Sequence, residues 1–412
     1  MTENIVTREV TLDDEVVASE TLCRRALQTD YPGFPDRLPT APKYPEDCFE
    51  MLCGIPYDRK HVQDLYRLKA EAERIGLRTP YAVERFIVLQ AYLVSLPRLL
   101  SLPVDQSVNR QFCGTCRQIA LPVQAPDTRL ALDSDAFAEL AQIITLRRFH
   151  AGQLSFDIMK MPRAWLLKIH PIALLGLIHE IWSRFGGFGP VAMPHVNYWR
   201  ANPSFILRRE QERALWRITK SIEYQNDIKG MIASSWLYSP NLAESVPHLG
   251  WVREFFIAHN AYIVDAGPAL EDAGFLVGSE KRRRLYADGG FRPRETLVLW
   301  HRADMLAWAN KCRDLHEPAS PRNRPSNTRA TRHTHPHQNS NVNRTTKSKQ
   351  YTLIDCRRLL YYRPRCYVFA ILLLPALCAA ILSGAGWTAW AMFPTFLCVL
   401  FFMWLFQYFL LQ

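Results

Sequence analysis

The sequence lacks the short motifs that mark several common enzyme classes. Its 412 residues contain no GxSxG nucleophile elbow, no P-loop and no protein-kinase signature. The zinc motif HExxH is also missing, because Ser183 stands four residues after His179. Residues 186–189, GGFG, follow a predicted helix instead of leading from a strand into one, so they predict a helix end and not a nucleotide loop. These absences exclude the familiar signatures of serine hydrolases, nucleotide-driven enzymes and zinc peptidases.

Charge is absent from residues 366–411, a run of 46 residues. Roughly 20 apolar residues span a bilayer core, so this run is long enough for two helices, joined at residues 383–386 (SGAG). Arg357, Arg358, Arg363 and Arg365 precede it directly. The positive-inside bias predicts that this side is cytoplasmic. We therefore expect a two-span membrane hairpin with the folded part and the C-terminus in the cytoplasm, and a buried core hairpin is the alternative.

Apolar residues are nearly absent from 317–350, which predicts a disordered linker. Residues 317–365 hold eleven Lys or Arg and two acidic residues, a net charge of +9 out of +11 for the chain. The basicity therefore belongs to one segment before the hairpin, and no broad basic surface or groove-reading motif predicts nucleic-acid binding. We expect residues 357–365 to engage anionic lipids, while a protein partner stays unknown.

A basic region followed by an apolar core is missing at the N-terminus, so no cleavable signal peptide is expected. The ten cysteines are scattered, as in reduced, cytosol-facing proteins. Cys113 and Cys116 have CxxC spacing, but a second pair with zinc spacing is lacking, which favours plain thiols over a metal or redox site. His170 and His179 would lie on opposite faces of one helix unless Pro171 divides it.

Five regions separate by composition: a Pro-rich extended arm at 1–57, a helical region at 58–150, an α/β domain at 151–316, the basic disordered linker at 317–365 and the hairpin at 366–411. Alternating strand and helix patterns from residue 152 onward predict an α/β fold with a mixed or largely parallel sheet and flanking helices. The expected strands are 153–159, 190–199 (an edge strand because of Pro194), 230–238, 261–267 and 294–300. The expected helices are 163–185, 203–225, 249–260, 279–290 and 303–312.

Residues 230–300 end in RRRLYADGGFRPRETLVLW, in which Leu285, Tyr286, Gly290 and Phe291 match an LYxxxGF pattern. This stretch resembles the C-terminal half of the GNAT-type N-acyltransferases. The resemblance implies that two central strands splay to form a cleft at Tyr286. It also implies that this tyrosine protonates the thiolate that leaves an acyl thioester.

The same resemblance implies a ligand, either acyl-coenzyme A or an acyl-carrier thioester, with Arg282, Arg283 and Arg284 near its phosphates. A helix with a solvated Arg face is the simpler interpretation. Strand and helix order further suggests Trp236 and Tyr238 as cofactor-binding residues, and Glu254 and His259 as bases. Two functions stay open: a membrane-anchored acyltransferase, and a non-enzymatic tethered protein that binds acidic partners or lipids.

Overall fold

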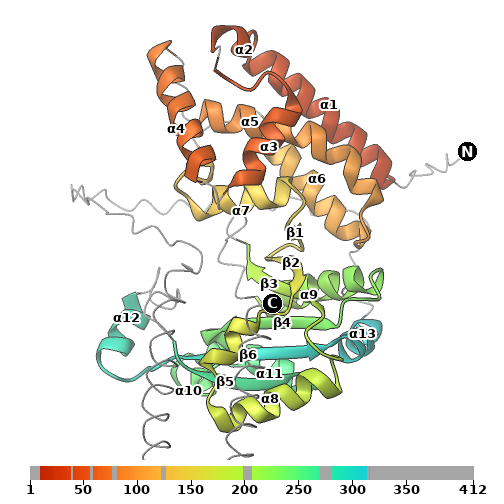
Figure 1. The fold of residues 1–412 in the computed structure, drawn as a ribbon, viewed down its shortest axis with the longest axis vertical. Coiled ribbons are helices and arrows are strands. Elements are labelled where there is room, and N and C mark those ends of the chain that lie inside the picture. The colour runs from red at the N-terminus through yellow and green to blue at the C-terminus, as the bar shows by residue number, and fades with distance from the viewer. Residues whose placement is uncertain are drawn as a thin grey trace, which may run out of the picture. The chain divides into compact units, whose positions relative to one another are not determined.

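A computed structural model describes residues 10–38, 40–55, 59–76, 81–121, 127–197, 207–269, 280–312 and 315. The fold is mixed α/β, with a group of N-terminal helices and a six-stranded sheet (Figure 1). The predicted linker and membrane hairpin lie outside the described residues. Among the helices of the described part, none combines the length and the apolar character that crossing a bilayer requires.

In the described part of the chain up to residue 144, helices surround one hydrophobic core whose residues run from Val16 to Ile144. The extended arm predicted for residues 1–57 is therefore corrected, because most of its described part is helical. Thr11 and Asp14 form a reciprocal capping box on the first helix, and Pro45 occupies the first turn of another, where its missing N–H costs nothing. The elements are α1 (Leu12–Asp30), α2 (Phe34–Arg37), α3 (Pro45–Gly54), α4 (Arg59–Arg74), α5 (Ala82–Ser95), η1 (Leu96–Ser101), α6 (Gln106–Ala120), η2 (Thr128–Leu130) and α7 (Asp135–Ile144).

The sheet has the strand order β1-β2-β3-β4-β6-β5. All neighbouring strands pair antiparallel except β3 and β4, which are parallel. The five strands predicted from the sequence are all present, and a short additional strand precedes them. Their bounds are β1 (Phe149–His150), β2 (Leu154–Lys160), β3 (Pro190–Val196), β4 (Gly230–Ser235), β5 (Tyr262–Pro268) and β6 (Arg294–His301).

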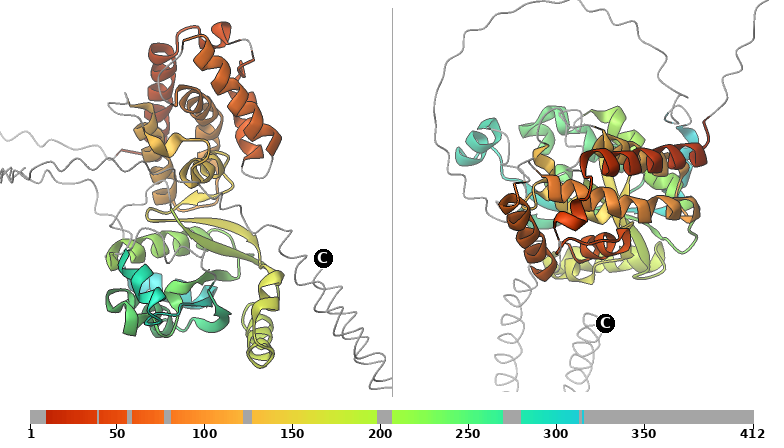
Figure 2. Two further views of the ribbon diagram at one scale, coloured as in Figure 1. Left: turned by 90° about the vertical axis from the view of Figure 1, so that its left-hand side faces the viewer. Right: turned by 90° about the horizontal axis from the view of Figure 1, so that it is seen from above.

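Helices cover both faces of the sheet (Figure 2). One core joins the first face to α9, α11 and α13, and contains Trp300 and Trp308. A second core joins the opposite face to α8 through Leu177 and Ile181. The elements are η3 (Arg163–Lys168), α8 (Pro171–Ser183), α9 (Arg208–Glu223), η6 (Trp236–Tyr238), α10 (Leu242–Ser245), η7 (Pro247–Leu249), α11 (Trp251–Ala258), α12 (Glu280–Ala287) and α13 (Arg302–Lys311).

Pro171 divides the long helix predicted for residues 163–185. A 3₁₀ segment ends at Lys168, His170 is the N-cap and Pro171 begins α8, because proline fits the first helical turn but not the interior. The helix ends before Gly186 and Gly187, both with positive φ, as the sequence predicts.

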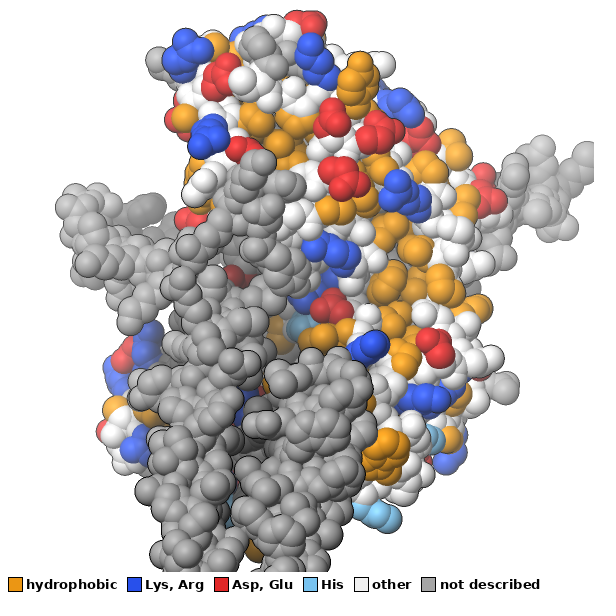
Figure 3. Space-filling view, viewed as in Figure 1, with side chains coloured by type: hydrophobic (Ala, Val, Ile, Leu, Met, Phe, Trp, Pro, Cys, Tyr) orange, Lys and Arg blue, Asp and Glu red, His pale blue; other side chains and the backbone are white. Residues whose placement is uncertain are grey.

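Buried polar contacts join the N-terminal helices to the sheet. Thr115 Oγ1 of α6 lies 3.0 Å from His150 Nδ1 of β1, and Ser155 of β2 donates a hydrogen bond to the carboxylate of Glu139 of α7. On the face seen in Figure 3, acidic and basic side chains alternate over these helices. This mixture forms no continuous basic field on that face. Local ion pairs such as Arg24–Glu20 also occur on the N-terminal helices.

Candidate functional site

The parallel strands β3 and β4 diverge almost at once. Their ladder contains a single pair, Ala192 opposite Met231, whereas β2 and β3 share seven pairs. Both strands continue past that pair, β3 to Val196 and β4 to Ser235. The carboxyl ends of these two central strands therefore separate, and ligands of open α/β sheets bind where carboxyl strand ends separate.

Pro194 gives the divergence a local cause. Asn197 N donates to Gln153 O over 3.1 Å, so this pair is hydrogen-bonded and the pairs alternate along β2 and β3. Pro194 lies opposite Phe156 at a position that is not hydrogen-bonded to β2. Its ring nitrogen therefore faces β4, where it has no proton to donate. The prediction of an edge strand is corrected: β3 is central, and the proline ends its ladder with β4.

His195, the next residue, lies in a charged group on the diverging part of β3. Its Nε2 is 3.0 Å from Asp157 Oδ2 of β2. The guanidinium of Arg148 donates two hydrogen bonds, of 2.7 and 2.8 Å, to the same carboxylate. The side chains are 13–27% exposed. Because Nε2 faces Asp157, the imidazole is oriented and Nδ1 is the ring nitrogen that a substrate proton can reach.

The charge state of Asp157 follows from these partners. Burial alone would raise the pKa of its carboxyl group. The hydrogen bonds and charges of His195 and Arg148 outweigh burial and lower this pKa to about 2. Asp157 is therefore an anion at neutral pH, and it is suited to hold the imidazole in one tautomer and to stabilise an imidazolium.

A second polar group lies on β4 and β6. Ser234 Oγ donates to Glu295 Oε1 over 2.7 Å, and Lys168 Nζ lies 3.1 Å from the other carboxylate oxygen. Continuing the register of the Ala192–Met231 pair would place His195 opposite Ser234. The two groups thus belong to the two strand ends that separate.

Two helices begin at the same end of the sheet. Both α9 and α11 follow a parallel strand and run back along it, so their N-termini lie near the carboxyl ends of β3 and β4. The guanidinium of Arg208, at the start of α9, lies 5.9 Å from the ring centre of Trp251, at the start of α11. Helix N-termini present unpaired N–H groups and partial positive charge, which favours anions.

Tyr286, the acid implied by the family resemblance, lies on α12 in a separate small core. This cluster contains Trp236, Leu249 and Phe291, with Tyr286 packed against it. The guanidinium of Arg292 lies 4.6 Å from the Tyr286 ring centre. The proposed acid thus stays a prediction, and its helix follows β5, whereas the separated ends belong to β3 and β4.

The three consecutive arginines of α12 do different things. Arg282 lies over the Trp236 ring at 5.3 Å, which joins α12 to η6. Arg283 and Arg284 are exposed and form ion pairs with Glu280 on the same helix. Two of the three residues predicted to meet phosphates therefore lie on a solvated helix face, in local pairs that contribute little stability.

The other predicted site residues lie on or near α11. His259 packs on Phe255 and on the tryptophans of α13 and β6, and burial lowers its pKa. Glu254 is exposed on this helix. Tyr238 contacts Phe256 edge to face at 5.3 Å, and burial raises its pKa. These residues and Tyr286 thus pack in different clusters, and their roles stay predictions.

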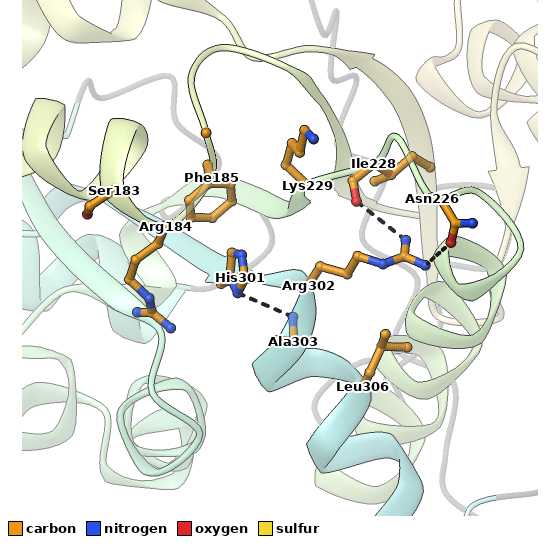
Figure 4. Close-up of a pocket in the computed structure, with 11 residues that line it drawn as sticks. Ser183, Arg184, Phe185, Asn226, Ile228, Lys229, His301, Arg302, Ala303 and Leu306 are labelled. Carbon is orange, nitrogen blue, oxygen red and sulfur yellow. Dashed lines mark hydrogen bonds between the residues drawn. The ribbon is translucent and has the colours of Figure 1, made fainter.

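A pocket of about 420 Å³ lies at the opposite end of β4 (Figure 4). Two of its lining residues, Arg302 and His301, cap helices. Arg302 donates to the carbonyl oxygens of Gln225 and Ile228 beyond the end of α9, and His301 Nδ1 accepts the Ala303 N–H at the start of α13. These contacts give Arg302 and His301 structural roles, and the pocket lies away from the separated strand ends.

The CxxC cysteines lie on α6 beside α1. Cys116 Sγ is 3.1 Å from Cys23 Sγ, and both thiols are fully buried. Burial raises the pKa of Cys113 to about 11 and raises that of Cys116 as well. In the described part of the chain, no three His, Cys, Asp or Glu side chains come together as a metal site would need.

The sequence analysis missed Arg148, Asp157 and His195. The alternation in residues 153–159 does put Asp157 on one face of a strand. Of its two partners, Arg148 lies in the bend just before β1, and His195 lies on β3, 38 residues after Asp157. Only the pairing register of the strands brings the three side chains together. The available signal was Asp157 itself, the only charged residue in the predicted strand 153–159.

Comparisons with known proteins give structural likeness only. No known family profile and no curated protein matches this chain. A solved structure of an acyltransferase in complex with decanoyl-CoA is 13% identical, covers 69% of this chain and 99% of its own, and has a TM-score of 0.35. An acyltransferase in complex with decanoyl-CoA and teicoplanin is 13% identical, covers 65% and 86%, and has a TM-score of 0.33. These values are too low to support an inference about function.

Proposed function

We propose that this protein transfers an acyl group from a thioester to an amine or hydroxyl at the separated ends of β3 and β4. The observation that carries the proposal is the single-pair ladder between these strands, with His195 on the part of β3 that leaves β4. The family resemblance of residues 230–300 required two central strands that splay. The resemblance placed the cleft at Tyr286, and the proposal places it at β3 and β4 instead.

The chemistry needs a base that is oriented and solvent-accessible. The His195 imidazole, held by Asp157, takes the proton of the attacking nitrogen or oxygen. A bond forms from that atom to the thioester carbonyl carbon, and the carbon–sulfur bond then breaks. The imidazolium returns its proton to the leaving thiolate, so no further acid is required.

The two helix N-termini support the choice of donor. The phosphates of coenzyme A, or of a carrier protein's prosthetic group, are anions that the starts of α9 and α11 would favour. Arg208 adds a positive charge at this end, although it also pairs with Glu212 at 2.7 Å. We further propose that residues 366–411 attach the protein to a membrane, with the folded part in the cytoplasm, where an acceptor at the lipid surface would be within reach.

The test is thiol release by the full chain from a series of acyl-coenzyme A donors and from acyl-carrier protein. We expect His195→Ala to lower kcat at least about a hundredfold, as removal of a general base does. His179→Ala is the matched control, because His179 is exposed on α8 and should leave the rate unchanged. Asp157→Asn should lower kcat and shift its pH profile.

The proposal is overturned if no donor releases thiol, or if the rate is the same in the His195 variant. The first result would favour the other function, a tethered protein that binds acidic partners or lipids. A rate that falls in a Tyr286 variant but not in the His195 variant would instead support Tyr286 as the general acid and a cleft at α12.

A further inference from the structure

Helix α8 carries an exposed apolar stripe. Ile172 is 79% exposed, Leu175 is 71% exposed and Trp182 is 56% exposed. Positions 172, 175, 179 and 182 follow the helical period and lie within about 80° of one another around the helix. The exposed His179 lies among the three apolar side chains. Large apolar side chains gathered on one helix face mark an interaction surface more often than isolated ones do.

The opposite face of α8 accounts for its position. Leu177, Ile181 and Phe185 are buried in the core beneath the sheet, where they meet Val191 and Leu299. Burial of this face packs the helix against the sheet, and the stripe lies on the side that is turned away. Figure 1 shows α8 at the outer edge of the sheet region. An apolar stripe that solvent reaches has a free-energy cost, which a partner would remove.

Charge around the stripe points to the class of partner. Glu180 is the only acidic residue of α8, and it pairs with Arg184 at 2.8 Å, off the stripe. Lys168, three residues before the helix, is exposed and also pairs with Glu295. A helix with an apolar face, a terminal tryptophan and flanking basic residues has the composition of a segment that lies in a membrane interface.

The chain outside the described structure favours lipid over other partners. Residues 317–365 have a net charge of +9, and residues 366–411 contain no charged residue. A membrane attachment there would keep the sheet region beside a bilayer, at high effective concentration. We propose that the stripe of Ile172, Leu175 and Trp182 lies in the interface of that bilayer and orients the folded part. This inference rests on the attachment proposed above.

The occupant of the stripe can be identified by photo-crosslinking. The full chain is made with p-benzoylphenylalanine in place of Leu175 and mixed with vesicles of phosphatidylcholine and phosphatidylserine. After irradiation, mass spectrometry identifies the adduct. We expect a lipid adduct at Leu175, at least several-fold above that of the matched control in place of Val17, which is 61% exposed on α1.

Flotation of the same samples with vesicles reports the attachment separately. If the chain floats and Leu175 gives no more lipid adduct than Val17, the inference about α8 is wrong while the attachment stands. An adduct with a second copy of the chain overturns it equally. If the chain does not float and forms no lipid adduct, both proposals fail, and thiol release still tests the acyl transfer.

Discussion

Single residues decide the chemistry at the separated strand ends. Pro194 withholds a donor from β4, and the next residue, His195, is held by Asp157. If His195 were shifted by one position along β3, the site would be altered, because neighbouring side chains of a strand point to opposite faces. The lowered pKa of Asp157 also makes its contribution to the free energy of unfolding depend on pH, so this contribution can be measured.

We predict that Asp157 stabilises the fold above pH 4 and that this contribution disappears in acid. Its pKa falls from 3.8 to about 2 on folding, so the unfolded state binds the proton first as the pH drops. The stability is complete above the unfolded pKa and is lost as the pH falls through the folded pKa. The shift corresponds to about 2 kcal/mol.

The measurement compares urea unfolding of the protein and of Asp157→Asn between pH 6 and pH 2. The difference between the two unfolding free energies should shrink by about 2 kcal/mol across the acid range. A difference that stays constant with pH would contradict the lowered pKa.

Elements of the sheet region depend on caps contributed by other elements. The sequence predicts α9 and α13 as separate helices, but the structure links them through Arg302. Its guanidinium donates to the carbonyl oxygens of Glu223 and Gln225 and to the side chain of Asn226. The last carbonyls of a helix have no partner within it, so this arginine supplies the missing donors.

We predict that Arg302→Ala lowers the free energy of unfolding by about 2 kcal/mol, because carbonyls near the end of α9 lose charged donors. Arg302→Lys should lose less, since one ammonium reaches fewer of these oxygens. Arg209→Ala, an exposed residue at the start of the same helix, is the control and should change stability by less than about 0.5 kcal/mol. Equal losses in Arg302→Ala and Arg209→Ala, measured by urea unfolding, would refute the capping role.

At the scale of the described structure, the N-terminal helices and the sheet region are joined by both apolar and polar contacts. Val104 and Val108, near the start of α6, are buried in the core of the sheet region. Asp105 N also donates to Ser221 Oγ of α9. Such shared burial couples two cores, because separating them would expose apolar and polar groups together.

We predict that the two cores unfold in one transition. Every tryptophan lies at position 165 or later, so tryptophan fluorescence does not report on the N-terminal helices, whereas circular dichroism at 222 nm does. The two signals should give the same urea midpoint. Separate midpoints would show that the two cores unfold independently of each other.

The sequence predicted well where the strands lie along the chain, but poorly which strands are adjacent in the sheet. The patterns at 153–159 and 294–300 place β2 and β6 correctly, since apolar runs between turn residues depend on local composition. The pattern at 230–238 places β4 correctly up to Ser235, after which residues 236–238 form η6. Pro194 was interpreted as the mark of an edge strand. Its actual place depends on which strand lies on each side, and composition carries no such information.

By itself, the sequence determined the α/β class and the position of five strands and of the helices that follow residue 163. It also showed a strongly basic segment followed by an uncharged one. These follow from periodicity and composition along the chain. Only the tertiary structure decided that β3 and β4 separate and that Arg148, Asp157 and His195 meet. Strand order and register join residues far apart in the sequence, and one local pattern is compatible with many such pairings.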